Sequence, residues 1–160
     1  MNKFQIVDSL DELDPESKNL IAHAQRSLEY AYAPYSKFNV AAAILLDNDE
    51  VVTGTNQENA AYPDGMCAER VALFAAVSRY PGVGIKRLAV VAKKENSATL
   101  TPATSCGSCR QVMLEFEQRQ ARAMSIIMQN EEHKWVIATS AASLLPFCFT
   151  KSSLHVSDRK

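Results

Sequence analysis

The hydrophobic positions of this chain follow two periods, one typical of helices and one typical of strands. Apolar residues three and four positions apart recur in three stretches. Asp14-Pro15 opens the first stretch and Pro34 ends it, whereas Pro81-Gly82 stops the second. The pattern predicts helices from Asp14 up to Pro34, from Cys67 up to Pro81 and from Cys106 or Gly107 through Phe116, with a last helical turn near Ser140 to Leu145.

Short apolar runs between polar turns predict the strands. Phe38 to Leu46 and Val51 to Thr55 flank the polar segment 47–50 and are typical of a hairpin. Leu88 to Ala92 is apolar throughout, as in a buried strand, and two more strands are expected at 123–128 and 135–138. The order α-β-β-α-β-α-β-β-α predicts an α/β protein in which helices cover both faces of a mixed five-stranded sheet.

The composition is that of an ordinary globular protein. With 160 residues, 47% of them hydrophobic, and no repeat or linker, a single domain over residues 1–160 is expected. No apolar run is long enough to cross a bilayer, and Met1 to Asp8 lacks the core of a secretory signal, so we expect a cytoplasmic protein without membrane association. The net charge of -1 argues against a nucleic-acid partner, because such binding depends on clustered Lys and Arg. A small neutral substrate fits better.

Three of the four cysteines stand in two short motifs. Cys67-Ala68-Glu69-Arg70 is followed 39 residues later by Cys106-Gly107-Ser108-Cys109. In a cytoplasmic chain this spacing indicates a metal site rather than disulfides. Three thiolates can hold Zn²⁺ with one coordination position open, and zinc lowers the pKa of a water there to about 7. The sequence therefore predicts a hydrolytic zinc site with Glu69 beside the water, and Cys148 is expected to be a small core residue instead of a ligand.

The two motifs together form the Cys₃ version of the zinc nucleobase deaminase pattern. Asn56-Gln57-Glu58-Asn59-Ala60-Ala61-Tyr62 leads into the first motif, and Arg110-Gln111-Val112 follows the second. From about Tyr35 to Phe149 the chain resembles the small homotetrameric cytidine deaminases. The resemblance implies a three-layer α/β/α sandwich with one Zn²⁺ per subunit. It also implies hydrolytic deamination of cytidine and 2'-deoxycytidine to the uridine forms with release of ammonia, as in pyrimidine salvage.

Glu69 is the expected catalytic residue. It would take the proton of the water, pass it to N3 of the pyrimidine as C4 is attacked, and help to protonate the departing amine. Three thiolates carry more negative charge than zinc carries positive charge, which weakens the pull of the metal on the water. Two features are predicted to offset this: the ligands Cys67, Cys106 and Cys109 lie at helix starts, and Arg70 is placed to donate to a thiolate.

The resemblance also assigns residues to the substrate. Asn56 and Glu58 match the pair that holds the ribose, and an amide beside a carboxylate satisfies sugar hydroxyls, although either residue alone is explained by a turn cap or by solvation. Phe38 aligns with an aromatic that packs on the pyrimidine, whereas the sequence alone favours ordinary core packing. Tyr62 and Phe149 match aromatics that reach a neighbouring subunit, so the resemblance implies a homotetramer with shared pockets.

The chain departs from the family pattern at two places. Ser105 stands where proline usually precedes the Cys-x-x-Cys motif, and Asn39-Val40-Ala41 stands where Pro-Val-Gly usually follows the aromatic. Because the loss of proline frees the backbone beside the expected leaving group, we hypothesise tolerance for larger N4 substituents. If Ser105→Pro leaves the ratio of rates on N4-alkylcytidine and cytidine unchanged, the hypothesis is wrong.

Several alternatives remain open at this stage. A deaminase of a modified cytosine nucleoside, N4-substituted or of the blasticidin-S type, shares the zinc motifs, and a noncatalytic zinc-binding scaffold would keep the fold. A closed structural zinc site requires a fourth ligand, for which His23, His133 and His155 are candidates outside any ligand-spaced motif. A redox Cys-x-x-Cys is the last alternative, and it lacks a convincing thioredoxin-like context.

Overall fold

The structure, a computed structural model, describes residues 3–154 as a sheet flanked by helices. The strands are β1 (Phe4–Val7), β2 (Phe38–Leu46), β3 (Val51–Thr55), β4 (Ile85–Lys94), β5 (Ser125–Gln129) and β6 (Trp135–Ala138). The helices are α1 (Pro15–Ser27), α2 (Ala68–Arg79) and α3 (Gly107–Gln120). Short 3₁₀ turns are η1 (Leu10–Glu12), η2 (Leu28–Tyr30), η3 (Tyr62–Asp64), η4 (Ala141–Leu144) and η5 (Lys151–Leu154).

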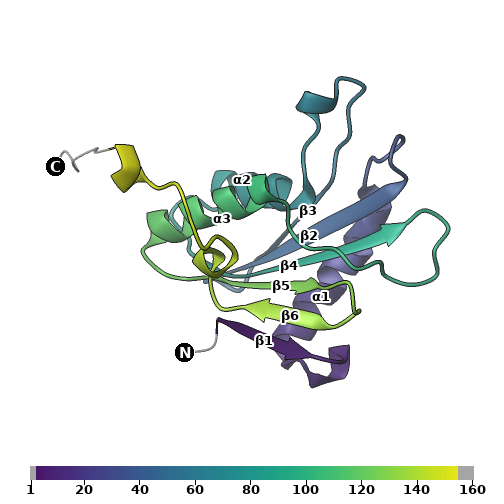
Figure 1. Cartoon of the computed structure of the whole chain (residues 1–160), viewed down its shortest axis with the longest axis horizontal. Coiled ribbons are helices and arrows are strands. Elements are labelled where there is room, and N and C mark those ends of the chain that lie inside the picture. The colour runs from purple at the N-terminus through teal and green to yellow at the C-terminus, as the bar shows by residue number, and fades with distance from the viewer. Residues whose placement is uncertain (1–2, 155–160) are drawn as a thin grey trace.

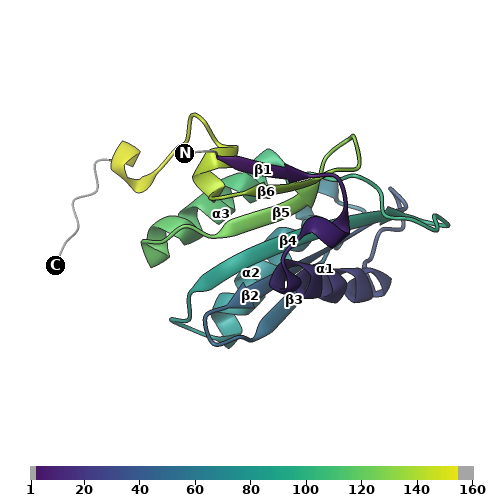
Figure 2. The same ribbon diagram turned by 90° about the horizontal axis from the view of Figure 1, so that it is seen from below.

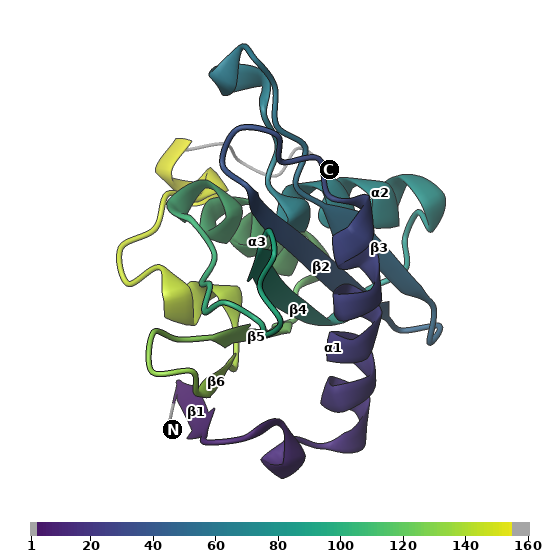
Figure 3. The same cartoon turned by 90° about the vertical axis from the view of Figure 1, so that its right-hand side faces the viewer.

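The strands form one mixed sheet in the order β1-β6-β5-β4-β2-β3. β4 and β5 run parallel, and the other neighbouring strands pair antiparallel. Helix α1 covers one face, and α2 and α3 cover the other (Figures 1 and 3). The predicted mixed sheet with helices on both faces is therefore confirmed, whereas the predicted number of five strands is wrong because the sheet has six.

The additional strand is β1, at one edge of the sheet. It pairs with β6 from Phe4 opposite Ala138 to Val7 opposite Trp135. Its first three residues are exposed and only Val7 enters a core. With four residues, of which only one is buried, the strand is too short to give a recognisable period, which is why the sequence did not reveal it.

Strand β2, which lies between β4 and β3, contributes to both cores of the protein. Ala42, Ile44 and Leu46 belong to the core beneath α2 and α3. The intervening residues Ala43 and Leu45 belong to the core beneath α1. Because both faces of this strand are covered, its sequence is an unbroken apolar run instead of an alternation.

The close packing of α2 on β3 depends on a glycine. A Cβ atom built at Gly54 would lie 2.4 Å from the backbone nitrogen of Ala72 and 2.8 Å from the carbonyl oxygen of Ala68. No side chain fits at that approach. Gly54 therefore lets the first turns of α2 lie against the sheet. Within residues 3–154, no helix combines the length and apolarity needed to cross a membrane.

Helix α1 is shorter than its apolar pattern suggests. It ends at Ser27, and the chain continues as η2 before Ala31 becomes extended. Leu28 remains buried in the core although it no longer lies in the α-helix. The prediction of a helix up to Pro34 is therefore wrong at its end, because the tighter 3₁₀ turn keeps the apolar spacing that suggested a continuing helix.

The start of α1 is fixed by Asp14 and an arginine from β4. Asp14 accepts hydrogen bonds from the backbone and hydroxyl of Ser17 at 3.0 and 2.7 Å, and Arg87 pairs with it at 2.7 Å. Partial burial acts to raise the pKa of Asp14, but the hydrogen bonds from Ser17 and Arg87 outweigh it and lower the pKa from 3.8 to about 2. The charged form of Asp14 is thus the form that the fold stabilises.

Asp14→Asn is expected to destabilise the protein in a pH-dependent way. A lowered folded-state pKa stabilises the fold above the unfolded value of 3.8, and this contribution is lost as the pH falls through about 2. Because the carboxyl group is 48% exposed, we expect only about 1 kcal/mol at pH 7. Urea unfolding of both proteins checks this: their difference in stability should largely disappear near pH 2, and a constant difference would contradict the assignment.

Candidate active site

The two cysteine motifs meet at the starts of α2 and α3, as their spacing predicted. Cys67 is the N-cap residue of α2, and Cys106 is the N-cap residue of α3. The sulfur of Cys106 accepts a hydrogen bond from the backbone nitrogen of Cys109 at 3.5 Å. Free N–H groups and the positive ends of two helix dipoles therefore lie next to the cluster, where they would offset the negative charge of three metal-bound thiolates.

The three sulfur atoms have a spacing that suits zinc. Cys67 Sγ and Cys106 Sγ are 3.8 Å apart, and the donor atoms of Cys67, Cys106 and Cys109 all lie within 4.8 Å of one another. Two sulfurs bound tetrahedrally at 2.3 Å would be about 3.8 Å apart. The donor set therefore fits a zinc ion held by three cysteines.

In the part of the chain that the structure describes, no histidine, carboxylate or fourth cysteine joins this cluster. His23 and His133 are outside it, and His155 falls outside the described residues. A set of three protein ligands leaves one position for water or substrate, which is the arrangement of catalytic rather than structural zinc sites.

Hydrogen bonds distribute charge unevenly among the thiols. The hydrogen bond from Cys109 is the main cause that lowers the pKa of Cys67 to about 5, with Arg70 adding to it. The same contact and burial raise the pKa of Cys109. Arg70 Nη2 lies 3.6 Å from the sulfur of Cys67, where it acts as a donor. The contact that the sequence suggested for Arg70 is therefore present, and its effect on a bound metal stays a prediction.

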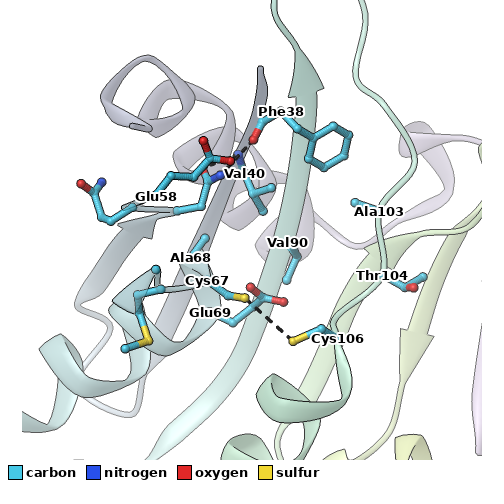
Figure 4. A pocket seen from close by; sticks show the side chains of 14 residues that line it. Phe38, Val40, Glu58, Cys67, Ala68, Glu69, Val90, Ala103, Thr104 and Cys106 are labelled. Carbon is cyan, nitrogen blue, oxygen red and sulfur yellow. Dashed lines mark hydrogen bonds between the residues drawn. The ribbon is translucent and has the colours of Figure 1, made fainter. Parts of the chain in front are cut away.

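Glu69 lies in the first turn of α2 and is only 4% exposed. Figure 4 shows its carboxylate beside Cys67, facing the pocket. Burial raises the pKa of Glu69, while its own backbone N–H and the nearby Ser105 act in the opposite direction. A carboxyl group whose pKa is raised by burial holds a proton more readily, which suits it to accept and release a proton during catalysis.

A pocket of about 300 Å³ opens in front of these residues. This volume is at the lower end of the range for small-molecule sites. Figure 4 shows Phe38 and Glu58 on one side of the pocket and the two cysteines with Glu69 on the other. The lining residues are Phe38, Val40, Asn56, Gln57, Glu58, Gly65, Met66, Cys67, Ala68, Glu69, Val90, Ala103, Thr104 and Cys106.

Asn56 and Glu58 line the pocket and also brace its rim. The side chain of Asn56 accepts from the backbone nitrogen of Val40 and donates to the carbonyl of Phe38, both at 2.9 Å. Glu58 accepts from the backbone nitrogens of Tyr35 and Ser36 at 2.9 and 3.2 Å. The hydrogen bond from the Ser36 side chain is the main cause that lowers the pKa of Glu58, so its carboxylate is an acceptor for hydroxyl groups.

Tyr62 and Phe149 do not line this pocket. Tyr62 is 75% exposed and lies in η3, at the tip of the arm that projects between β3 and α2 (Figure 1). Phe149 is 59% exposed, and its carbonyl accepts a hydrogen bond from Gln111 at 2.8 Å. Within one chain, the two aromatic residues therefore stand outside the site that the sequence assigned to them.

The prediction that Cys148 is a core residue is wrong, because its side chain is exposed. The segment between η4 and η5 leaves the body of the protein, as Figure 2 shows for the yellow C-terminal part. The flanking phenylalanines, Phe147 and Phe149, are exposed as well. The apolar run from Phe147 to Phe149 therefore lies on the surface of the chain and not in its core.

Sequence reasoning missed the pocket wall formed by Ala103 and Thr104. These residues lie in the long connection between β4 and α3, which has no helical or strand period. An isolated bridge between Ala103 and Gln129 fixes this connection against the sheet. The only available signal was their position directly before Cys106. Val40 and Val90 were predicted to lie in strands, and their place in the wall follows from the strands that carry them.

Known proteins share this sequence and architecture. The family described as "Cytidine and deoxycytidylate deaminase zinc-binding region" matches residues 15–125, which include both cysteine motifs. The chain is 42% identical over 138 residues to a cytidine deaminase of Sporosarcina psychrophila, covering 86% of this chain and 93% of that protein. It is 37% identical over 136 residues to a cytidine deaminase of Halalkalibacterium halodurans, covering 85% and 96%.

The same similarity appears in three dimensions. The crystal structure of a cytidine deaminase from Burkholderia pseudomallei superimposes with a TM-score of 0.69 at 37% sequence identity. The superposition covers 86% of this chain and 100% of the other. This chain, which has the three-sulfur cluster described above, is therefore similar to cytidine deaminases over most of its length, in sequence and in fold.

Proposed function

The chain belongs to the cytidine and deoxycytidylate deaminase family and is a hydrolytic deaminase, and on this premise we propose that it converts cytidine and 2'-deoxycytidine to uridine and 2'-deoxyuridine. The observation that carries this proposal is the placement of Glu69 beside a three-sulfur cluster at the floor of a pocket of about 300 Å³. The family is zinc-binding, and Cys67, Cys106 and Cys109 are the residues that would hold the ion.

Bound zinc supplies a Lewis acid that lowers the pKa of water toward 7. Glu69 takes the first proton of the attacking water and delivers it to N3 of the cytosine while the water oxygen forms a bond to C4. It then transfers the second proton to the amino nitrogen, so that the C4–N4 bond breaks and ammonia leaves. Cytidine and water thus give uridine and ammonia. Because Glu69 is 4% exposed, bulk water does not compete for these protons.

The charge of the pocket favours a nucleoside over a nucleotide. Glu58 and Glu69 are its charged lining residues, and no lysine or arginine is among the described residues that line it. A 5'-phosphate would therefore meet negative charge without a cation to pair with it. We assign Phe38 to the face of the base, and Asn56 and Glu58 to the ribose hydroxyls.

We also propose that the active form is a homotetramer whose pockets are shared between subunits. The support is the exposure of Tyr62 and Phe149, which stand on an arm and a C-terminal segment outside the body of the chain. Exposed aromatic side chains of this kind are enriched in interfaces. A role in pyrimidine salvage, a cytoplasmic location and a single domain over residues 1–160 stay predictions.

An absorbance assay with a panel of nucleosides tests the proposed function. We expect turnover of cytidine and 2'-deoxycytidine by protein that contains one zinc per chain. The 5'-monophosphate should have a kcat/KM lower by at least about tenfold, because its charge is unpaired in the pocket. A zinc-loaded protein that turns over none of these compounds would contradict the proposal, and a preference for the monophosphate would contradict the argument from charge.

The alternatives are not favoured. The similar proteins named above are cytidine deaminases, and a deaminase for N4-substituted or blasticidin-like nucleosides has no comparable support. A noncatalytic zinc scaffold does not require a buried carboxyl group in the pocket. Glu69 lies there, although burial of a charged group is unfavourable for the stability of the fold. The panel separates these cases, because each predicts a different set of substrates.

A further inference from the structure

The hydroxyl group of Ser105 is buried without a regular hydrogen bond. Ser105 is 2% exposed, and its Oγ atom has no hydrogen-bond partner among the described residues. The backbone around it is well fixed, because Arg110 Nε donates to the Ser105 carbonyl at 2.8 Å. Buried polar groups without partners are rare in native structures and often occur at functional sites. This hydroxyl group therefore requires an explanation.

The position of Ser105 connects its hydroxyl to the catalytic carboxylate. The residues on either side of it, Thr104 and Cys106, both line the pocket. The carboxylate of Glu69 lies close to Cys106, the residue that follows Ser105 (Figure 4). The buried Ser105 hydroxyl acts to lower the pKa of this carboxyl group, although the two groups do not form a hydrogen bond of regular geometry here. The hydroxyl is thus a free donor beside the group that must move protons.

A serine at this position can do what the usual residue cannot. The family that the chain resembles usually has proline here, which has neither a hydroxyl nor a backbone N–H. A serine hydroxyl can both donate and accept a hydrogen bond. Replacing proline by serine therefore adds a buried polar group between two residues that line the pocket, and this is a property of the present chain.

We propose that Ser105 is a positioning residue that donates a hydrogen bond to the Glu69 carboxylate in the substrate complex and so holds it toward the reacting atoms. Buried carboxylates are not oriented by solvent, so their direction depends on neighbouring donors. A hydrogen bond that strengthens between the substrate complex and the transition state raises kcat without a comparable change in KM. This inference rests on the proposed function, because it assigns Ser105 to the same reaction.

Steady-state kinetics on cytidine test the proposal with the zinc-loaded variant Ser105→Ala. Because hydrogen bonds to charged groups are strong, we expect kcat to fall roughly ten- to a hundredfold while KM changes by less than about twofold. Zinc content and melting temperature should be unchanged. Ser27→Ala is the matched control, since this serine is also buried but lies at the end of α1, on the other face of the sheet. Its kcat should equal that of the wild type.

Binding measurements give a readout that does not depend on turnover. Ser105→Ala should weaken the binding of a pyrimidine nucleoside with a tetrahedral, hydroxyl-bearing C4 roughly tenfold, while the affinity for uridine stays the same. In the Glu69→Gln background, Ser105→Ala should cause no further loss, because the serine acts through Glu69.

The outcomes separate this inference from the proposed function. If the wild type is active and Ser105→Ala keeps the full kcat, the role of Ser105 is overturned and the proposed function is not. A loss of kcat that is accompanied by loss of zinc, or an equal further loss in the Glu69→Gln background, also overturns it, since the serine would then be structural. No turnover by the wild type overturns the proposed function and this inference together.

Discussion

Replacing Glu69 by glutamine is expected to reduce kcat on cytidine by at least about a thousandfold, because one carboxyl group performs every proton transfer of the reaction. Glutamine has a similar shape but cannot take up a proton from water. Glu69 is not one of the three clustered thiol ligands, so the variant should bind zinc as the wild type does. It should also be at least as stable, because burial raises the pKa of Glu69 and the charged form therefore opposes folding.

Glu117→Gln is the matched control for this experiment. Glu117 is 7% exposed and lies away from the pocket. Its Oε1 accepts from the backbone nitrogens of Met124 and Ala141 at 2.9 and 2.6 Å, and its Oε2 accepts from the backbone nitrogen of Ala142 at 3.2 Å. Its replacement should lower the melting temperature, because glutamine has one acceptor oxygen where the carboxylate has two, and leave kcat nearly unchanged. If Glu69→Gln keeps more than about a tenth of the wild-type kcat with full zinc, Glu69 is not the proton carrier.

Three strands were predictable because each has a short apolar run next to a polar turn. The bounds of β2, β3 and β6 agree with the predicted Phe38 to Leu46, Val51 to Thr55 and Trp135 to Ala138. Burial on both faces of β2 produces an unbroken run, and the polar segment 47–50 marks its end. Strand β1 lacks such a signal, because its pairing with β6 is a contact between distant parts of the chain.

The residues of the cysteine cluster could be predicted from the sequence, whereas the full wall of the pocket could not. Cys67 and Cys106 could be placed near helix starts from local spacing, and their meeting point follows from the packing of α2 and α3 on one face. The wall at Ala103 and Thr104 depends on how an irregular connection folds back onto β5. The places of Tyr62 and Phe149 in a shared pocket depend on other subunits, so the single chain leaves them as predictions.

Replacing Cys109 by alanine is the sharpest test of the metal site. Cys109 is fully buried in the core beneath α2 and α3, with its sulfur in the cluster with Cys67 and Cys106. Loss of a residue that merely orients a zinc ligand weakens metal affinity 10- to 100-fold, so loss of a ligand itself should weaken zinc binding by more than about a hundredfold. Deaminase activity should disappear with the metal.

The fourth cysteine provides the control for this prediction. Cys148 is exposed and outside the cluster, so Cys148→Ala should keep one zinc per chain and wild-type activity. Competition with a chromophoric chelator measures zinc affinity directly and does not depend on turnover. Equal zinc affinity in the two variants would show that Cys109 is not a ligand. Only Cys67 and Cys106 would then hold the metal, since no other protein donor joins them in the described part of the chain. The prediction of three protein ligands and one position open to water would therefore be wrong.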